Sequence, residues 1–294
     1  MFEGFERHDV EVGGATIHVS TGGSGPPLLL LHGFPQTHMI WHPVAPVLAE
    51  RFTVVCADLR GYGDSSKPPT DQHHAPYAKR AMALDMVETM AALGHDRFDL
   101  VGHDRGGRVA HRLVLDHPER VGKLALLDIV PTRTLFEATN QAIATGYYHW
   151  FFLVQPAPLP EDLINAEPIA YLRAKLGRWG SASEAFPPAV VAEYERCIQD
   201  PRTVHAMCED YRAAATIDLD HDRADEQARI RCPLLVLWGE KGLMHRHFDV
   251  PATWRVKHAE PESVRAAVMP CGHFLPEEAP DEVTAALRSF LGTG

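Results

Sequence analysis

The stretch LVGHDRGGR, residues 100–108, decides the fold of this chain. It joins an apolar run to a Gly-x-Asp-x-Gly turn, and residues 109–116 after it are compatible with a helix. This order predicts a buried strand, a tight turn and a helix. Gly102 and Gly106 flank the turn because a side chain at either position would clash with the neighbouring strand or helix. The backbone strain of such a turn falls on Asp104.

Asp104 stands where the nucleophile elbow of an α/β-hydrolase usually carries a serine. A serine hydroxyl attacks only after a base has removed its proton, whereas an aspartate, with a reference pKa of about 3.9, is ionised at neutral pH. Such a carboxylate can attack a saturated carbon, expel a leaving group and become an ester. We therefore predict Asp104 as a covalent nucleophile; the alternative is that the pentapeptide is an ordinary turn.

The composition is that of a globular enzyme with a sizeable core, since the chain has 294 residues, of which 45% are hydrophobic and 23% charged. No apolar stretch approaches the ~18–20 residues of a membrane span, and the first residues do not read as a signal peptide. We therefore expect no membrane partner. The length fits one large α/β domain with an insertion as well as two domains.

The net charge and the cysteine pattern argue against metal-binding and nucleic-acid-binding proteins. The five cysteines are scattered and form no C-x-x-C pair, which indicates a reducing cytoplasm and no bound metal. A formal net charge of -11 disfavours nucleic acid as a partner. If the substrate is anionic, a few local arginines must attract it against the overall field.

Strands and helices alternate along the first half of the chain, which predicts a doubly wound, mostly parallel sheet. Residues 8–20 alternate around Gly13-Gly14 as in a hairpin, and Leu28–Leu31 read as a strand buried on both faces. The other expected elements here are helices at 41–50, 79–93 and 106–117 and strands at 53–57, 98–102 and 123–128.

The alternation stops after Asp128. Residues 130–225 are richer in proline and aromatic residues and contain helical stretches at 188–200 and 202–215, without strands between them. Strand patterns return at 233–238 and 264–269, and a helix follows at 280–291. We therefore predict a core domain of residues 1–129 and 226–294 and an inserted helical cap of residues 130–225.

A catalytic triad in this fold runs nucleophile, acid, histidine along the chain. His273 follows the last strand and is the predicted base. Many relatives carry the acid in a Trp-Gly-x-x-Asp segment, but residues 238–242 read WGEKG, with Gly242 at the acid position. Asp128 ends the strand after the elbow helix at the same edge of the sheet, so we assign the acid to it, with Glu240 as a distant second candidate.

Two arginines follow the nucleophile. Arg105 and Arg108 are spaced i and i+3, so their side chains share one helix face. They could be ion-pair partners of Asp104, but one arginine would suffice for that, and two guanidinium groups suit a substrate carboxylate. Arg112 is expected to be solvated. Backbone N–H groups of Phe34, in the segment HGFP, and of Arg105 are the predicted oxyanion hole.

These motifs resemble those of the α/β-hydrolase haloacetate dehalogenases, and among them the fluoroacetate dehalogenases, over essentially the whole chain. The matching segments are GHDRGGR at 102–108, DIVPT at 128–132, YYHWF at 147–151 and EDYR at 209–212. The resemblance implies hydrolysis of haloacetates, fluoroacetate giving glycolate and fluoride, through an aspartyl ester. It implies a homodimer, no cofactor, and an acid at the Asp128 position.

The resemblance also assigns the remaining site residues. It implies that Arg105 and Arg108 hold the carboxylate of a small anionic substrate, and that His149, Trp150 and Tyr211 receive the halide. Because fluoride is a poor leaving group, hydrogen-bond donors are needed where its charge grows. Without the resemblance, aromatic residues in a cap are more often core than ligand.

Other functions stay open at this point. An epoxide hydrolase uses the same aspartate and histidine chemistry but needs two cap tyrosines; Tyr211 is one candidate, and His149-Trp150 stands where the other is expected. Arg105 fits a neutral epoxide poorly. A serine esterase lacks its elbow serine here. A binding protein on a decayed hydrolase fold is disfavoured by the intact set of Asp104, Asp128 and His273.

Overall fold

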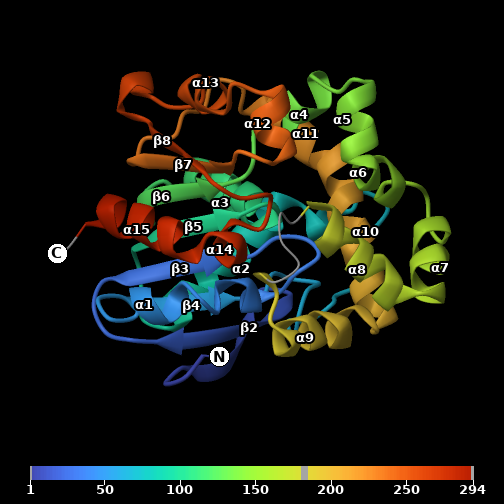
Figure 1. The fold of residues 1–294 in the computed structure, drawn as a ribbon, viewed down its shortest axis with the longest axis horizontal. Coiled ribbons are helices and arrows are strands. Elements are labelled where there is room, and N and C mark those ends of the chain that lie inside the picture. Colours follow the sequence, from blue (N-terminus) through green and yellow to red (C-terminus); the bar gives the residue numbers. More distant parts are fainter. Residues whose placement is uncertain (1, 180–184, 293–294) are drawn as a thin grey trace.

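The computed structural model describes residues 2–179 and 185–292. Within them, eight strands form one sheet in the order β1-β2-β4-β3-β5-β6-β7-β8 (Figure 1). The β1–β2 and β2–β4 pairs are antiparallel and all other pairs are parallel. The strands are β1 (Glu6–Val12), β2 (Ala15–Gly22), β3 (Pro27–Leu31), β4 (Thr53–Ala57), β5 (Phe98–His103), β6 (Val121–Leu127), β7 (Leu234–Gly239) and β8 (Arg265–Met269).

The apolar run of β3 explains why helices cover both faces of the sheet. Successive side chains of a strand point to opposite faces, so Leu29 and Leu31 enter one buried cluster and Leu28 and Leu30 enter another. The first cluster includes α2 (Lys79–Ala92) and α3 (Arg105–Asp116), and the second includes α1 (Ala45–Leu48) and α15 (Pro280–Leu291). The predicted doubly wound sheet is confirmed.

One expected helix is shorter than predicted. Residues 41–50 contain only α1 (Ala45–Leu48), preceded by the 3-10 turn η1 (His38–Trp41). Pro43 and Pro46 lie in this segment, and because a proline has no backbone N–H, it is tolerated in the first turn of a helix and disrupts its interior. The predicted ten-residue helix is therefore wrong in extent.

Between β6 and β7 the described residues are mainly helical, and these helices lie at the carboxyl ends of the parallel strands (Figure 1). They are α4 (Thr132–Glu137), α5 (Gln141–Gly146), α6 (Tyr148–Leu153), α7 (Leu159–Ala166), α8 (Pro168–Trp179), α9 (Pro188–Ile198), α10 (Pro201–Ala215) and α11 (Ile217–Ala224). We keep the boundaries 130 and 225 of the cap as a proposal; residues 180–184 within it lie outside the described ranges.

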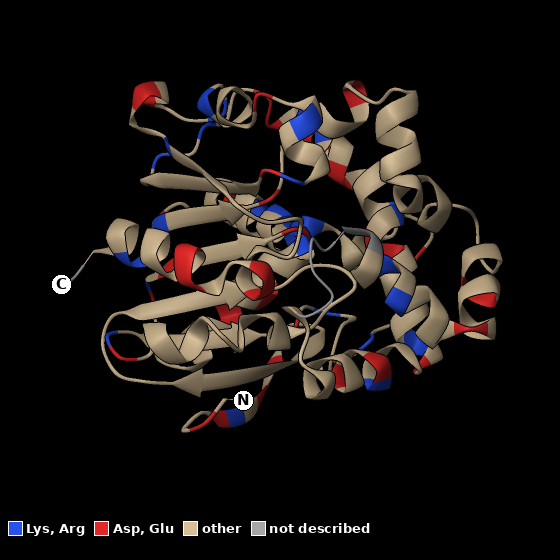
Figure 2. Ribbon diagram, in the orientation of Figure 1, with Lys and Arg blue, Asp and Glu red and all other residues tan. Residues whose placement is uncertain are grey.

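The remaining elements are short and connect the main ones: η2 (Ala75–Tyr77), α12 (Leu243–His247), α13 (Val250–Arg255), η4 (Pro261–Ser263) and α14 (Leu275–Glu278). Acidic and basic residues are spread over both the sheet region and the inserted helices (Figure 2). No helix among the described residues is long and apolar enough to cross a bilayer.

Candidate active site

The turn between β5 and α3 holds Asp104 in a strained conformation, with φ 47° and ψ −114°. A Cβ atom on Gly102 would lie 2.5 Å from the carbonyl oxygen of Gly106, and one on Gly106 would lie 2.3 Å from that of His32. A Cβ on Gly33 would lie 2.4 Å from the Cβ of Asp104. The two flanking glycines therefore have the steric role predicted for them, and the aspartate sits at the expected elbow.

The structure brings the three predicted triad residues together. The Nδ1–H of His273 donates to Oδ2 of Asp128 over 2.6 Å, and Nε2 of the same ring lies 3.9 Å from Oδ2 of Asp104. Oδ1 of Asp128 accepts a hydrogen bond from the backbone N–H of Gly239 at 3.1 Å. Glu240, the second candidate for the acid, is exposed to solvent. Asp128 thus orients the histidine.

The loop that carries His273 is fixed by groups that the sequence pattern did not reveal. The carboxylate of Glu278 accepts hydrogen bonds from the backbone N–H groups of Gly272 at 2.9 Å and of Phe274 at 2.8 Å. Nε2 of His103 donates to the carbonyl oxygen of His273 at 2.8 Å. The position of His103, directly before Asp104, is the sequence feature that could have indicated a role for it at this site.

Electrostatics favour an ionised nucleophile. Burial would raise the pKa of Asp104, but the nearby charges of His273, Arg108 and Arg105 outweigh it and lower the pKa below its usual value. Burial opposes protonation of His273, yet the hydrogen bond to Asp128 and the charges of Asp128 and Asp104 raise its pKa. Burial lowers the pKa of His103 to about 3, so that ring is neutral.

One predicted oxyanion-hole donor already contacts the predicted nucleophile. The backbone N–H of Phe34 donates to Oδ1 of Asp104 at 3.0 Å, across 70 positions of sequence. Asp104 is also buried, with 6% of its surface exposed. An oxygen of its carboxylate therefore sits beside a donor that can stabilise negative charge when that carboxyl group is attacked.

Both predicted arginines are buried, but they differ in their partners. Nε and Nη2 of Arg105 bond to Asp210, and Nη1 has no partner among the described residues. Nη1 of Arg108 donates to the carbonyl oxygen of Val130 at 3.1 Å and to Oγ1 of Thr132 at 3.0 Å. Burial and the charge of Arg105 lower the pKa of Arg108 to about 10. Both groups keep N–H atoms for a further acceptor.

Arg112 corrects an expectation from the sequence. It is not solvated: only 5% of its surface is exposed. Its Nη2 lies 3.0 Å from a carboxylate oxygen of Asp116 and 2.9 Å from one of Asp225. Asp116 lies four residues further along α3, so only the pairing with Asp225, which follows α11, required the tertiary fold.

Three aromatic side chains of the inserted helices meet above the arginines. The ring of Tyr211, from α10, lies 5.5 Å from the rings of both His149 and Trp150, from α6. The guanidinium carbon of Arg105 is 4.2 Å from the Tyr211 ring, and that of Arg108 is 4.6 Å from the Trp150 ring. These contacts place the predicted halide residues beside the predicted carboxylate residues.

The protonation of this aromatic group suits hydrogen-bond donation. Burial raises the pKa of Tyr211 well above its usual value, so the phenol keeps its proton. Its hydroxyl has no partner among the described residues. Burial also lowers the pKa of His149 well below its usual value, so that ring is neutral.

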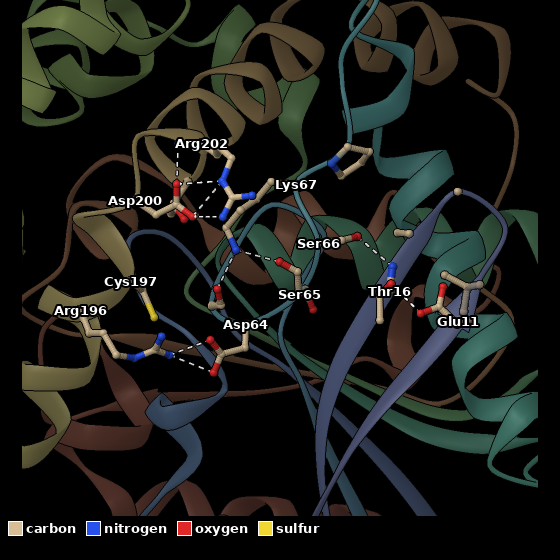
Figure 3. Close-up of a pocket in the computed structure, with 16 residues that line it drawn as sticks. Glu11, Thr16, Asp64, Ser65, Ser66, Lys67, Arg196, Cys197, Asp200 and Arg202 are labelled. Carbon is tan, nitrogen blue, oxygen red and sulfur yellow. Dashed lines mark hydrogen bonds and ion pairs between the residues drawn. The ribbon is translucent and has the colours of Figure 1, made fainter.

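A separate surface groove of about 750 Å³ lies between the β1–β2 hairpin, the loop after β4 and the inserted helices α9 and α10 (Figure 3). Its cations are paired within the protein: Arg196 with Asp64, Arg202 with Asp200, and Lys67 with carbonyl oxygens. It contains none of the predicted site residues.

In the parts of the chain that the structure describes, no cluster of three or more His, Cys, Asp or Glu side chains could hold a metal ion.

The fold and the elbow define the class of protein. Residues 26–280 match the family model of the α/β hydrolase fold, and the chain belongs to this family. The resemblance stated from the sequence is confirmed: the chain is 50% identical to a fluoroacetate dehalogenase from Burkholderia sp. over 99% of this chain and 95% of that protein.

Two further similarities complete the comparison. A soluble epoxide hydrolase from Corynebacterium sp. (strain C12) is 34% identical over 97% of this chain and 96% of its own. A solved α/β-hydrolase structure from Nostoc sp. PCC 7120 superposes with a TM-score of 0.98 at 57% identity, covering all of both chains. The chain is therefore an enzyme of the α/β-hydrolase type.

Proposed function

We propose that this enzyme hydrolyses haloacetates, converting fluoroacetate to glycolate and fluoride through a covalent ester on Asp104. The observation that carries the proposal is a pair of buried guanidinium groups, on the helix that begins directly after the elbow aspartate, in contact with aromatic side chains of the inserted helices. A small carboxylate fits those cations, and a neutral substrate would leave Arg108, which has no ion pair with a carboxylate among the described residues, without a counter-ion. The 50% identical fluoroacetate dehalogenase supports the same reaction.

In the first step, a carboxylate oxygen of Asp104 attacks the α-carbon and the carbon–halogen bond breaks, with the electron pair leaving on the halide. Arg105 and Arg108 hold the substrate carboxylate so that the attack is in line. Good alignment of reactants can supply up to about 7–11 kcal/mol. His149, Trp150 and Tyr211 donate hydrogen bonds to the departing halide, as their positions on α6 and α10 allow.

In the second step, His273 removes a proton from a water molecule, and the resulting hydroxide attacks the carbonyl carbon of the ester. Asp128 holds the ring in the tautomer whose Nε2 can accept that proton. The N–H groups of Phe34 and Arg105 stabilise the oxyanion, and one such donor is typically worth ~3–4 kcal/mol. Collapse of this intermediate breaks the bond to the glycolate oxygen, which takes up the proton from His273, and loss of the remaining proton to solvent leaves Asp104 ionised again.

The decisive experiment measures halide release from fluoroacetate and chloroacetate, with styrene oxide turnover as the competing assay. A single turnover in heavy-oxygen water tests the intermediate, since hydrolysis of an aspartyl ester places the label in Asp104. Label that appears directly in glycolate would refute covalent catalysis.

The second candidate is an epoxide hydrolase. It is favoured by the 34% identical relative and by the Tyr211 hydroxyl, which has no partner among the described residues and could protonate an opening epoxide oxygen. It leaves the buried charge of Arg108 without a role. Styrene oxide turnover without fluoride release from fluoroacetate would reverse the ranking.

Assembly and location are also proposals. We infer a homodimer from the resemblance to the dehalogenase family, which light scattering of the purified protein tests. We infer a cytoplasmic location from the cysteines, none of which is in a disulfide. Fractionation of the producing cell tests it.

A further inference from the structure

Asp210, the residue before Tyr211 on α10, is fully buried and takes no part in the proposed chemical steps. Its Oδ2 accepts from Nε of Arg105 at 2.8 Å, and its Oδ1 accepts from Nη2 at 2.6 Å. The Tyr62 hydroxyl donates to Oδ2 at 2.7 Å, and the ammonium group of Lys79 pairs with Oδ1. Two core segments and the elbow arginine thus converge on one carboxylate of an inserted helix.

These contacts determine which N–H groups of Arg105 remain available. The backbone carbonyl of Asp210 also accepts from Nη2, at 2.8 Å. Because Nε and Nη2 are engaged, only Nη1 is left, and this atom is buried without a partner among the described residues. A guanidinium group is planar, so fixing two of its nitrogens fixes the direction of the third.

The two arginines also differ in whether a carboxylate balances their charge. Arg105 and Lys79 are balanced by Asp210 and by Asp218, whose Oδ2 lies 3.4 Å from Nζ of Lys79. Arg108 has no ion pair with a carboxylate in the described part of the chain; its Nη1 bonds to neutral oxygens. A buried cation without a counter-ion is costly, and a substrate carboxylate would relieve that cost.

We propose that Asp210 is a positioning residue that aims Nη1 of Arg105 at the substrate carboxylate, while Arg108 supplies the charge that the carboxylate neutralises. The two arginines then have different roles: Arg105 orients the substrate carboxylate, and Arg108 attracts it electrostatically. The identity of the substrate rests on the proposed function, but the carboxylate site does not require that the bound acid reacts.

The test compares wild type with Asp210→Asn and with the matched control Asp218→Asn, which removes a carboxylate from the same lysine without touching Arg105. Two quantities are measured: KM and kcat for fluoroacetate, and the dissociation constant of glycolate by calorimetry, with glycolamide as the neutral comparison. For Asp210→Asn we expect kcat/KM to fall about 100-fold, as for a misplaced positioning group. Glycolate binding should weaken in parallel, and Asp218→Asn should retain wild-type values.

The outcomes separate the two proposals. If wild type binds glycolate in preference to glycolamide but releases no fluoride, the proposed function fails and the role of Asp210 is still tested by glycolate binding. Unchanged glycolate binding in Asp210→Asn, or an equal loss in Asp218→Asn, overturns the positioning role, and so does a wild type that does not distinguish glycolate from glycolamide. If Asp210→Asn does not fold, Tyr62→Phe, which removes one hydrogen bond to Asp210, must weaken glycolate binding without changing binding of glycolamide.

Discussion

Nε2 of His273 lies 3.9 Å from Oδ2 of Asp104, a separation too long for a hydrogen bond. The histidine therefore forms no hydrogen bond with the carboxylate that we propose as the nucleophile. Its other nitrogen is held at 2.6 Å by Asp128. The predicted base is thus oriented independently of the predicted nucleophile, as the proposed action of His273 on an ester in a later step requires.

Replacing the predicted base, His273, should stop the reaction after the ester has formed and before it is hydrolysed. With His273→Asn, Asp104 still displaces the halide, but no group removes the proton from water. We expect one equivalent of halide per active site and then no turnover, with a carboxymethyl group on Asp104 found by mass spectrometry of its peptide. Steady multiple turnover in this variant would contradict the role of His273.

The pH dependence follows from the same pair. The hydrogen bond and charge of Asp128 raise the pKa of His273, so the ring loses its base function as the pH falls through a value above about 6.5. Hydrolysis of the ester should slow in acid and the ester should accumulate, because the lowered pKa of Asp104 keeps the first step active. Rapid quench at a series of pH values measures both steps.

Asp128→Asn provides the control for that profile. It removes the main source of the raised pKa of His273, since the charge of Asp104 is absent in the ester. The acid inflection of ester hydrolysis should therefore move to lower pH while its maximum rate falls. An inflection that does not move would mean that another group titrates.

Arg108→Met should impair substrate capture. Truncating one partner of a buried, hydrogen-bonded charge pair costs roughly 2–5 kcal/mol, and about 1.4 kcal/mol is tenfold, so kcat/KM for fluoroacetate should fall by about 30-fold or more. The matched control is Arg112→Met, one turn further along α3 and paired with Asp116 and Asp225. Equal losses in both variants would point to helix stability instead.

Tyr211→Phe should discriminate between halides. Loss of one donor that acts on developing charge typically costs about 100–1000-fold in kcat. We expect a loss of that size for fluoroacetate and a smaller one for bromoacetate, because bromide departs with less help. Halide-release rates for both substrates check this. The same factor for both would show that the hydroxyl does not serve the leaving group.

A buried carboxyl group away from the elbow should affect stability. Glu277 accepts a hydrogen bond from Tyr194 at 2.9 Å and one from Gln36, linking α9 to the core, and burial raises its pKa well above the usual value. The folded state then binds more protons than the unfolded state above pH ~4.5, so stability falls as the pH rises. Glu277→Gln should flatten this slope, as thermal unfolding at several pH values would show; an unchanged slope would assign it to other groups.

Much of the architecture was predictable from local patterns. The strand β4 and the helix α15 have the predicted bounds, because alternation, apolar runs and the glycines of the elbow are local signals. The three predicted triad residues lie together because chain order and the carboxyl edge of a parallel sheet restrict where they stand, and their catalytic roles stay a prediction. The expected helix at 41–50 is wrong in extent, because Pro43 and Pro46 restrict the α-helical residues to Ala45–Leu48.

The pairing of buried charges could not be predicted. Arg112 was expected in solvent, and Asp210 was given no role, although it holds Arg105. The partners are 113 and 105 positions apart, taking 225 − 112 and 210 − 105. The periodicity of apolar and polar residues indicates only contacts between residues a few positions apart, so it cannot predict pairs at these sequence separations.

By itself, the sequence determined the sheet, the elbow and the residue types that can perform the chemistry, because these depend on neighbours along the chain. Only the tertiary structure decided which N–H groups and which arginine are without a partner or counter-ion among the described residues, and what anchors the histidine loop. Those properties depend on which side chains are buried together, and burial is set when the inserted helices pack against the strand ends.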